Sequence, residues 1–287
     1  MPKISIIGKG AFGTALHTLY SNAGNRVHWF GRDIPDRMDT EYVFLAVPSH
    51  SVREVLQKTK VGSTSTIILC CKGFLADGSF PSSLVPEITN YAVLSGPGFA
   101  DELAQALPTV HSIAALGSGG EKIASDLSLP SFRLYWSTDP IGVQTCGALK
   151  NILAIAVGMT QALELGENAR AALIARGTNE FRHAVNYLGG REDTLWSPAG
   201  LGDLILTCTS PKSRNFRFGK MIANGVSVQT ALSDLGTVEG YSAVAALLKV
   251  VPAERLPVVS TLDQVLRGEV SPEAAIKQLM SRPITHA

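Results

Sequence analysis

The sequence has few cysteines and no recognisable metal-binding pattern. Its four cysteines, Cys70, Cys71, Cys146 and Cys208, form no Cys-x-x-Cys pair, and its six histidines show no metal-ligand spacing. We therefore expect a metal-free, cytoplasmic protein with reduced cysteines. Cys146 and Cys208 are interpreted as small buried side chains rather than nucleophiles, because neither has an evident base beside it.

A charge excess, a targeting segment and long apolar runs are also missing. The net charge of +1 over 287 residues gives no reason to expect nucleic acid or an anionic membrane as a partner. Met1-Pro2-Lys3 leads directly into an apolar segment, so no signal peptide is expected. Uninterrupted apolar stretches such as residues 152–159 are too short to cross a bilayer. A hydrophobic content of 45% still allows a sizeable core, and the length fits two domains.

A glycine-rich loop stands near the start of the chain, between an expected strand at residues 3–7 and an expected helix at residues 14–21. It reads Gly8-Lys9-Gly10-Ala11-Phe12-Gly13. In this position the pattern Gly-x-Gly-x-x-Gly predicts a dinucleotide site, since the glycines permit a tight turn and close approach to a pyrophosphate. The N-terminus of the following helix favours the phosphates. Lys9 is unusual in such a loop, and it either reaches a phosphate or points to water.

Alternating strand and helix patterns continue to about residue 136 and predict a Rossmann-like, doubly wound parallel sheet. Further strands are expected at residues 26–30, 42–47, 66–70, 91–94, 109–115 and 132–136, and helices at 51–58, 101–106 and 121–127. Ligands bind such sheets at the carboxyl ends of the strands, where we expect Lys72, Gly96 and Gly98. Only about a dozen residues separate the second and third strands, so this connection should be an abbreviated loop.

After Trp136 the strand signals stop and helical patterns take over. Helices are predicted at residues 141–165 and 168–188, around Asp203, and at residues 216–223, 242–250 and 260–266. The sequence therefore predicts an α/β chain with a dinucleotide-binding domain, residues 1–138, and a mostly α-helical substrate and catalytic domain, residues 139–287.

Two motifs in the helical half carry polar side chains suited to chemistry. In Gly147-Ala148-Leu149-Lys150-Asn151 a lysine stands among apolar residues. It either extends to solvent or is a buried amine with lowered proton affinity, and a nearby Asp203 would oppose that lowering. In residues 200–215, Asp203 and Thr207 share a helical face, and Ser213-Arg214-Asn215 follows. The planar donor fork of Arg214 suits a phosphate.

Together these motifs resemble the bacterial-type NAD(P)-dependent glycerol-3-phosphate dehydrogenase family. The resemblance covers nearly the whole chain and is carried by residues 8–16, 71–73, 95–100, 142–151, 168–177, 200–215 and 238–240. It implies a Rossmann-like domain followed by a helical domain, and reversible reduction of dihydroxyacetone phosphate to sn-glycerol 3-phosphate with NAD(P)H. That product would supply phospholipid synthesis. Members of the family are commonly homodimers.

The resemblance also implies site roles. Lys150 is the catalytic proton donor and acceptor. The expected substrate-binding residues are Lys72, Gly96, Asn151, Asp203, Ser213, Arg214 and Asn215. The expected cofactor-binding residues are Gly8, Gly10, Ala11, Phe12, Gly13, Arg32, Lys72, Ala100, Arg214, Thr237 and Glu239.

The chain departs from the family pattern in three places. The connection after Arg32 is much shorter than in relatives, Gly98 replaces a serine, and Thr145-Cys146 replaces a leucine–glycine pair. Two alternatives also remain. One is a dehydrogenase for another small hydroxy acid on the same two-domain plan, and the other is a dinucleotide-binding sensor without catalysis.

The end of the second strand favours NADPH over NADH. An acid at this point would bind both ribose hydroxyls and repel a 2′-phosphate. Here Gly31 leaves space and Arg32 offers a permanent positive charge. Asp33 is the counterargument, since it would favour NAD if it turned inward. We expect both cofactors to be accepted, with a modest preference for NADPH.

Overall fold

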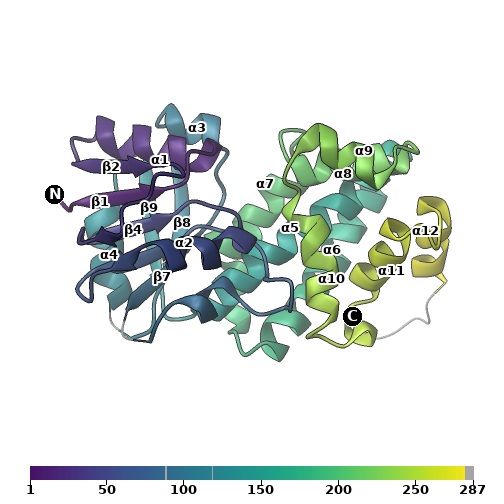
Figure 1. Ribbon diagram of the computed structural model, residues 1–287. Coiled ribbons are helices and arrows are strands. Elements are labelled where there is room, and N and C mark those ends of the chain that lie inside the picture. Colours follow the sequence, from purple (N-terminus) through teal and green to yellow (C-terminus); the bar gives the residue numbers. More distant parts are fainter. Residues whose placement is uncertain (88, 118, 282–287) are drawn as a thin grey trace.

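The computed structural model describes residues 1–87, 89–117 and 119–281 as a sheet-based half joined to a helical half (Figure 1). The main sheet has the order β2-β1-β4-β6-β7-β8-β9. Its strands are β1 (Ile4–Ile7), β2 (Val27–Phe30), β4 (Tyr42–Leu45), β6 (Thr66–Leu69), β7 (Asn90–Ser95), β8 (Thr109–Ala114) and β9 (Phe132–Ser137). The chain moves outward from β1 to β2 and returns on the other side of β1 to β4. This switch point is where open α/β sheets bind ligands.

Both faces of the sheet are buried, which explains its continuous apolar strands. Helices α1 (Ala11–Asn22), α3 (Ala100–Ala104) and α4 (Gly119–Leu127) cover one face, and Ile6 and Phe44 point toward them. Helix α2 (Val52–Lys58) and the start of α5 (Pro140–Ala162) cover the other face, where Ile7 and Leu45 lie. Successive strand residues thus alternate between the two layers.

Two connections in the sheet-based half bear on the predictions. Residues 31–41, all of them described, contain the two-residue strand β3 (Arg37–Met38) and no helix, which confirms the abbreviated loop. Strand β3 pairs with β5 (Lys60–Val61) outside the main sheet. Strand β8, in contrast, runs antiparallel to β7, a direction that the sequence patterns did not predict, and the other pairs of the main sheet are parallel as predicted. After β7 the chain forms only the short α3 and then re-enters the sheet from the same edge.

The helical half is built around α5. Its other helices are α6 (Gly166–Tyr187), α7 (Asp203–Thr209), α8 (Arg214–Ala223), α9 (Val228–Leu235), α10 (Glu239–Leu248), α11 (Pro257–Leu266) and α12 (Pro272–Met280). Short helical turns occur in both halves. They are η1 (Ser49–Ser51) and η2 (Pro81–Leu84) in the sheet-based half, and η3 (Glu192–Trp196), η4 (Pro198–Gly202) and η5 (Ala253–Arg255) in the helical half. The sequence patterns missed α9 and α12, although each starts at a serine whose side chain accepts a hydrogen bond from the first turn.

Helices α5 and α8 cross with their backbones in contact. A Cβ atom on Gly158 would lie 2.0 Å from the carbonyl oxygen of Phe216, and one on Gly219 would lie 1.9 Å from that of Ile155. Only glycine fits at these two positions. The contact brings the start of α8, with the Ser213-Arg214-Asn215 motif, alongside the middle of α5.

By length and composition α5 could cross a bilayer, and among the described residues it is the one helix that passes this test. The expectation that no stretch is long enough concerned uninterrupted apolar runs, whereas this test takes the helix as a whole. However, 89% of the most apolar window of α5 is buried inside the structure. That burial is what distinguishes a core helix of this length from a membrane span.

The two halves meet at Asp139, between the end of β9 at Ser137 and the start of α5 at Pro140. One carboxylate oxygen of Asp139 accepts a hydrogen bond from the Gly142 amide at 2.8 Å, and the other accepts one from Thr194 Oγ1 at 2.6 Å. Asp139 thereby caps α5 and ties it to η3. The division into domains between residues 138 and 139 stays a prediction, and residues 282–287 of the predicted second domain lie outside the described residues.

Candidate active site

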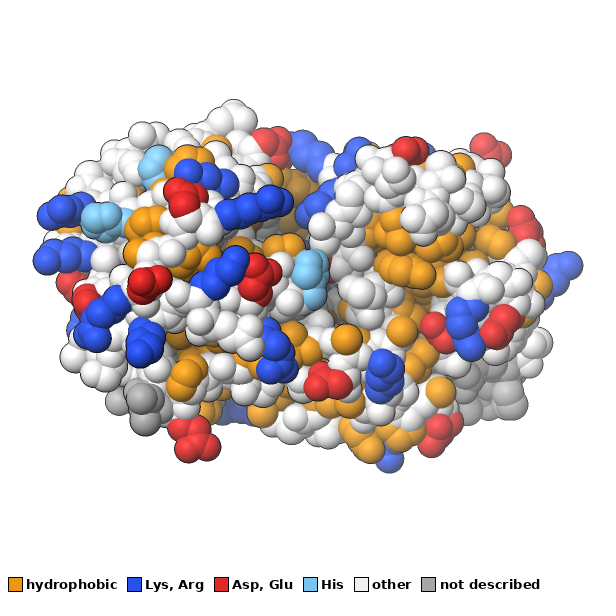
Figure 2. Space-filling view, in the orientation of Figure 1, with side chains coloured by type: hydrophobic (Ala, Val, Ile, Leu, Met, Phe, Trp, Pro, Cys, Tyr) orange, Lys and Arg blue, Asp and Glu red, His pale blue; other side chains and the backbone are white. Residues whose placement is uncertain are grey.

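A cleft of about 950 Å³ lies between the two halves. Figure 2 shows a hollow at this junction, with Lys and Arg side chains at its rim. The predicted site residues that line the cleft are Gly10, Ala11, Phe12, Lys72, Ala100, Lys150, Asn151, Asp203, Ser213, Arg214, Asn215, Thr237 and Glu239. They come from separate loops and helices, so the fold assembles most of the predicted site in one place.

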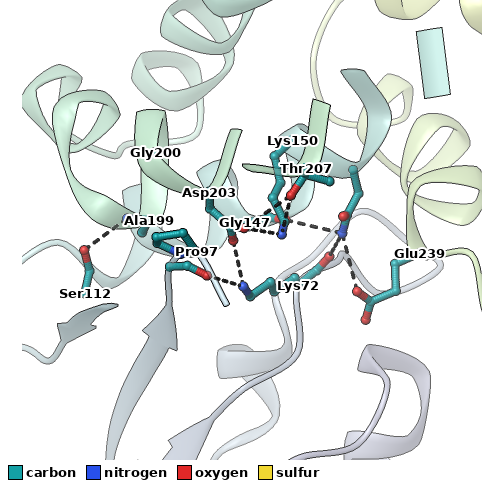
Figure 3. Close-up of polar contacts among 12 residues, drawn as sticks. Lys72, Pro97, Ser112, Gly147, Lys150, Ala199, Gly200, Asp203, Thr207 and Glu239 are labelled. Carbon is teal, nitrogen blue, oxygen red and sulfur yellow. Dashed lines mark hydrogen bonds and ion pairs between the residues drawn. The ribbon is translucent and has the colours of Figure 1, made fainter. Parts of the chain in front are cut away.

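The buried centre of the cleft is an ion pair between Lys150 on α5 and Asp203 on α7 (Figure 3). Lys150 Nζ lies 2.5 Å from Asp203 Oδ1 and also donates to Thr207 Oγ1 at 3.0 Å. Asp203 is the first residue of α7 and follows the π-helical turn η4, so the positive end of the helix dipole also favours its carboxylate. An ammonium group has three donors, and these two contacts leave one for a ligand.

Lys72 approaches the same carboxylate from the sheet-based half. Its Nζ lies 2.7 Å from Asp203 Oδ2 (Figure 3). It also donates to the Gly96 carbonyl oxygen at 2.8 Å. Lys72 follows β6 and Gly96 follows β7, as expected for the carboxyl edge of the sheet. Gly96 contributes its carbonyl group and does not line the cleft. Asp203 therefore joins two cationic side chains from opposite halves of the molecule.

Burial and the neighbouring charges together set the pKa values in this cluster. For Lys150 burial has the larger influence. It lowers the pKa of Lys150 to about 8, although the Asp203 carboxylate opposes the shift. For Asp203, burial disfavours the carboxylate, but the ammonium groups of Lys150 and Lys72 outweigh it and the pKa is lowered. The question that the sequence left open is thus answered: Lys150 is buried, and desolvation is the larger influence on its proton.

An amide network surrounds the ion pair. Asn151 Nδ2 donates to the Lys72 carbonyl oxygen at 3.0 Å and lies 3.4 Å from Glu239 Oε2. Asn215 Nδ2 donates to Asn151 Oδ1 at 2.8 Å, and Asn215 Oδ1 accepts from the Gly240 amide at 3.0 Å. Burial raises the pKa of Glu239. The network ties the starts of α8 and α10 to the middle of α5 and so holds the cleft wall in place.

The cationic side of the cleft comes from α8 and the turn before it. Ser213 caps α8, since its Oγ accepts a hydrogen bond from the Phe216 amide at 3.2 Å. Arg214 is exposed, and no ion pair within residues 1–87, 89–117 and 119–281 includes it. Lys212 lies 2.8 Å from both Asp101 and Glu102 of α3 and bridges the two halves.

The glycine loop fits a dinucleotide. Gly8 has a φ of +119°, and a Cβ atom there would lie 2.3 Å from the Ala46 carbonyl oxygen. A Cβ atom on Gly13 would lie 2.1 Å from the Gly8 carbonyl oxygen, so both residues must be glycine for the loop to pack. Next to Gly10, in contrast, nothing lies within 4 Å of such a Cβ position, and Ala11 begins α1. Gly8 and Gly13 thus shape the loop, while Gly10 leaves open space for a pyrophosphate at a helix N-terminus.

Two features at the edge of the cleft differ from simple expectation. Arg32 is exposed and is not among the cleft-lining residues. Gly98 has a structural reason to be glycine here: a Cβ atom on it would lie 2.9 Å from Cε1 of His111. The His111 ring is fully buried, and burial lowers its pKa to about 3. An uncharged imidazole therefore takes up the space that a side chain at position 98 would need.

Sequence reasoning left Thr207, Lys212 and Arg217 out of the site, although all three line the cleft. The four-residue spacing between Asp203 and Thr207 was the available signal for the first, and closeness to Ser213-Arg214 for the others. Burial raises the thiol pKa of both Cys146 and Cys208 to about 12, in line with their interpretation as inert. Among the residues that the structure describes, no group of three or more His, Cys, Asp or Glu side chains could hold a metal ion.

Comparison with known proteins identifies the family. Residues 33–118 match the sequence model of the NAD-dependent glycerol-3-phosphate dehydrogenase N-terminus, and residues 139–277 match that of its C-terminus. The chain is 37% identical to glycerol-3-phosphate dehydrogenase [NAD(P)+] of Synechococcus sp. (strain RCC307) over 98% of each chain. It is 38% identical to that of Agrobacterium fabrum (strain C58 / ATCC 33970), over 99% of this chain and 98% of the relative.

The structural comparison agrees. The crystal structure of glycerol-3-phosphate dehydrogenase from Coxiella burnetii superposes with a TM-score of 0.89 at 30% identity, over 98% of this chain and 99% of that one. The alignment to the Agrobacterium relative spans 324 positions against the 287 residues of this chain, so this chain is the shorter of the two. The chain belongs to the NAD(P)-dependent glycerol-3-phosphate dehydrogenase family of oxidoreductases.

Proposed function

We propose that the chain reversibly reduces dihydroxyacetone phosphate to sn-glycerol 3-phosphate with NADH or NADPH, and that Lys150 is its proton donor and acceptor. The main observation in support of this proposal is the Lys150–Asp203–Lys72 cluster, which faces the same cleft as the glycine loop. A bound nicotinamide would supply or accept the hydride. The side chains of the cluster would then donate or accept the proton and stabilise the developing negative charge on the substrate oxygen.

The proton role of Lys150 follows from its contacts. Asp203 and Thr207 hold two of its three donors, so the third has a defined direction into the cleft. A pKa near 8 allows the ammonium to give up a proton in reduction and the amine to take it back in oxidation. Lys72 is fixed in the same way by Asp203 and Gly96, and its remaining donor would bind a substrate oxygen.

The substrate phosphate would lie against the start of α8. Arg214 offers a bidentate fork and forms no ion pair with a described residue, although the Glu239 carboxylate is near enough to interact with its charge. The Ser213 hydroxyl and the helix N-terminus would add further donors. Asn215 has its amide engaged with Asn151 and Gly240, so we assign it a positioning role. Asn151 in turn would orient Lys72 and the substrate hydroxyl.

The remaining parts of the proposal rest on the glycine loop and on family likeness. Gly8, Gly10, Ala11, Phe12, Gly13, Ala100, Thr237 and Glu239 would contact the dinucleotide, with residues 1–138 as its domain and residues 139–287 as the substrate domain. Arg32 would give a modest preference for NADPH. We further propose a cytoplasmic homodimer that supplies glycerol 3-phosphate for phospholipid synthesis.

The test is the oxidation of NADH and NADPH, followed optically with dihydroxyacetone phosphate as substrate. We expect turnover that depends on the phosphate group, with little reduction of the unphosphorylated ketone. Reduction of a 2-keto acid instead would favour a dehydrogenase for another hydroxy acid. Cofactor binding without reduction of any ketone phosphate by folded protein would favour a sensor.

A further inference from the structure

Lys9 is the one side chain of the glycine loop that carries a charge. It is exposed, and its side chain crosses the end of β2. A Cβ atom on Gly31 would lie 3.3 Å from Cδ and 3.6 Å from Cε of Lys9. Its ammonium nitrogen lies 5.1 Å from the centre of the Trp29 ring. Lys9 therefore does not extend freely into solvent, and it lies across Gly31.

Trp29 provides a fixed support for this arrangement. Its Nε1 donates a hydrogen bond to the Gly8 carbonyl oxygen at 3.1 Å, and its ring stacks on His17 of α1 with centroids 4.4 Å apart. The ring is thus tied to both the loop and the helix that follows it. An ammonium over an aromatic face is weakly attracted to it, which restricts where Lys9 can point.

A positively charged and a negatively charged side chain both lie next to Gly31. None of the ion pairs among the described residues includes Lys9, so its positive charge has no carboxylate partner there. Asp33 also turns toward Gly31, with Oδ1 3.3 Å from the same Cβ position. Arg32, which stands between Gly31 and Asp33 in the sequence, is exposed and does not line the cleft. One cation and one acid therefore flank the glycine that ends β2.

In a dinucleotide fold of this kind, the pyrophosphate lies on the glycine loop and the adenosine ribose lies at the end of the second strand. We propose that Lys9 binds the 2′-phosphate of NADP(H), while Asp33 accepts hydrogen bonds from the ribose hydroxyls of NAD(H). This assignment rests on the proposed function and deepens it. It makes Lys9, from the loop itself, the main determinant of NADP(H) binding, and it makes Arg32 a lesser contributor.

The test measures binding without turnover, by calorimetric titration with 2′,5′-ADP and with 5′-AMP, which differ only in the 2′-phosphate. Lys9→Met keeps most of the length of the side chain and removes the charge. Because a hydrogen bond between an ammonium and a phosphate is charge-assisted, we expect Lys9→Met to weaken 2′,5′-ADP binding by about tenfold. Binding of 5′-AMP should stay unchanged, and Lys9→Arg should retain most of the affinity for 2′,5′-ADP.

Lys3→Met is the matched control, because Lys3 is an exposed lysine at the opposite end of β1. It removes the same charge and should leave both affinities unchanged. Equal weakening of both ligands by Lys9→Met would overturn the assignment and place Lys9 at the shared 5′-phosphate. No change in either would show that Lys9 faces water. Since no turnover is needed, an inactive wild type that still binds 2′,5′-ADP would refute the proposed function but not the role of Lys9.

Discussion

The proposed substrate site and the proposed adenosine site are built in different ways. At the proposed substrate site, Asp203 holds Lys150 and Lys72 from opposite halves of the molecule, and the carboxylate is 1% exposed. At the proposed adenosine site, which we call the adenosine end, Lys9, Arg32 and Asp33 are exposed side chains around a glycine. Buried charges must satisfy one another in a single arrangement, whereas exposed charges are screened by solvent. We therefore expect large effects from changes at the proposed substrate site and graded effects at the adenosine end.

The largest effect should follow from Lys150→Ala. Loss of a general acid typically costs about 10²–10⁴ in rate, so reduction of dihydroxyacetone phosphate should nearly cease. Binding of the dinucleotide should change little, because the amine acts on the substrate oxygen. Steady-state rates and a cofactor titration on the same preparation would measure both. A variant with the wild-type rate would show that the proton comes from another group.

Arg214→Ala should have the next largest effect, on substrate saturation. Losing charge-assisted hydrogen bonds to a phosphate corresponds to an increase of about 10- to 100-fold in the Michaelis constant for dihydroxyacetone phosphate. Lys220→Ala is a matched control, because Lys220 is an exposed, positively charged residue in the last turn of the same helix. If both variants saturate like the wild type, the phosphate lies elsewhere in the cleft.

The pH dependence should separate the two directions of the reaction. Reduction needs the Lys150 ammonium, so its rate should fall as pH rises through about 8, whereas oxidation needs the neutral amine and should rise over the same range. Asp203→Asn removes the carboxylate that favours the ammonium, so it should move both transitions to lower pH. Parallel pH profiles for the two directions would contradict the role of Lys150.

The smallest effect should come from Arg32→Ala at the adenosine end. Exposed ion pairs contribute about 0–1 kcal/mol, so the Michaelis constant for NADPH should rise by no more than about fivefold. The constant for NADH should not change. An equal rise for both cofactors would mean that Arg32 does not contact the 2′-phosphate. An effect larger than that of Lys9→Met would reverse the order of importance that we propose for the two cations.

Local sequence patterns were sufficient for much of the fold. The Gly8–Gly13 loop between a strand and a helix, the short connection after Arg32 and the long helix with Lys150 all lie where the sequence predicts them. These features depend on glycine at tight backbone positions, on apolar periodicity and on chain length, all of which are local properties. The antiparallel direction of β8 was missed, because it depends on pairing with β7 rather than on a local pattern. Helices α9 and α12 were missed although each has a local signal, a serine at its N-cap.

By itself, the sequence determined the family, the order of the two halves and the residues that could carry the chemistry. Only the tertiary structure decided what those residues do to one another. Lys72 and Asp203 are far apart in the chain, and whether Lys150 is buried or solvated depends on how α5 packs. Burial lowers the proton affinity of Lys150, and Asp203 raises it, so the balance exists only where the folded chain brings both lysines to one carboxylate.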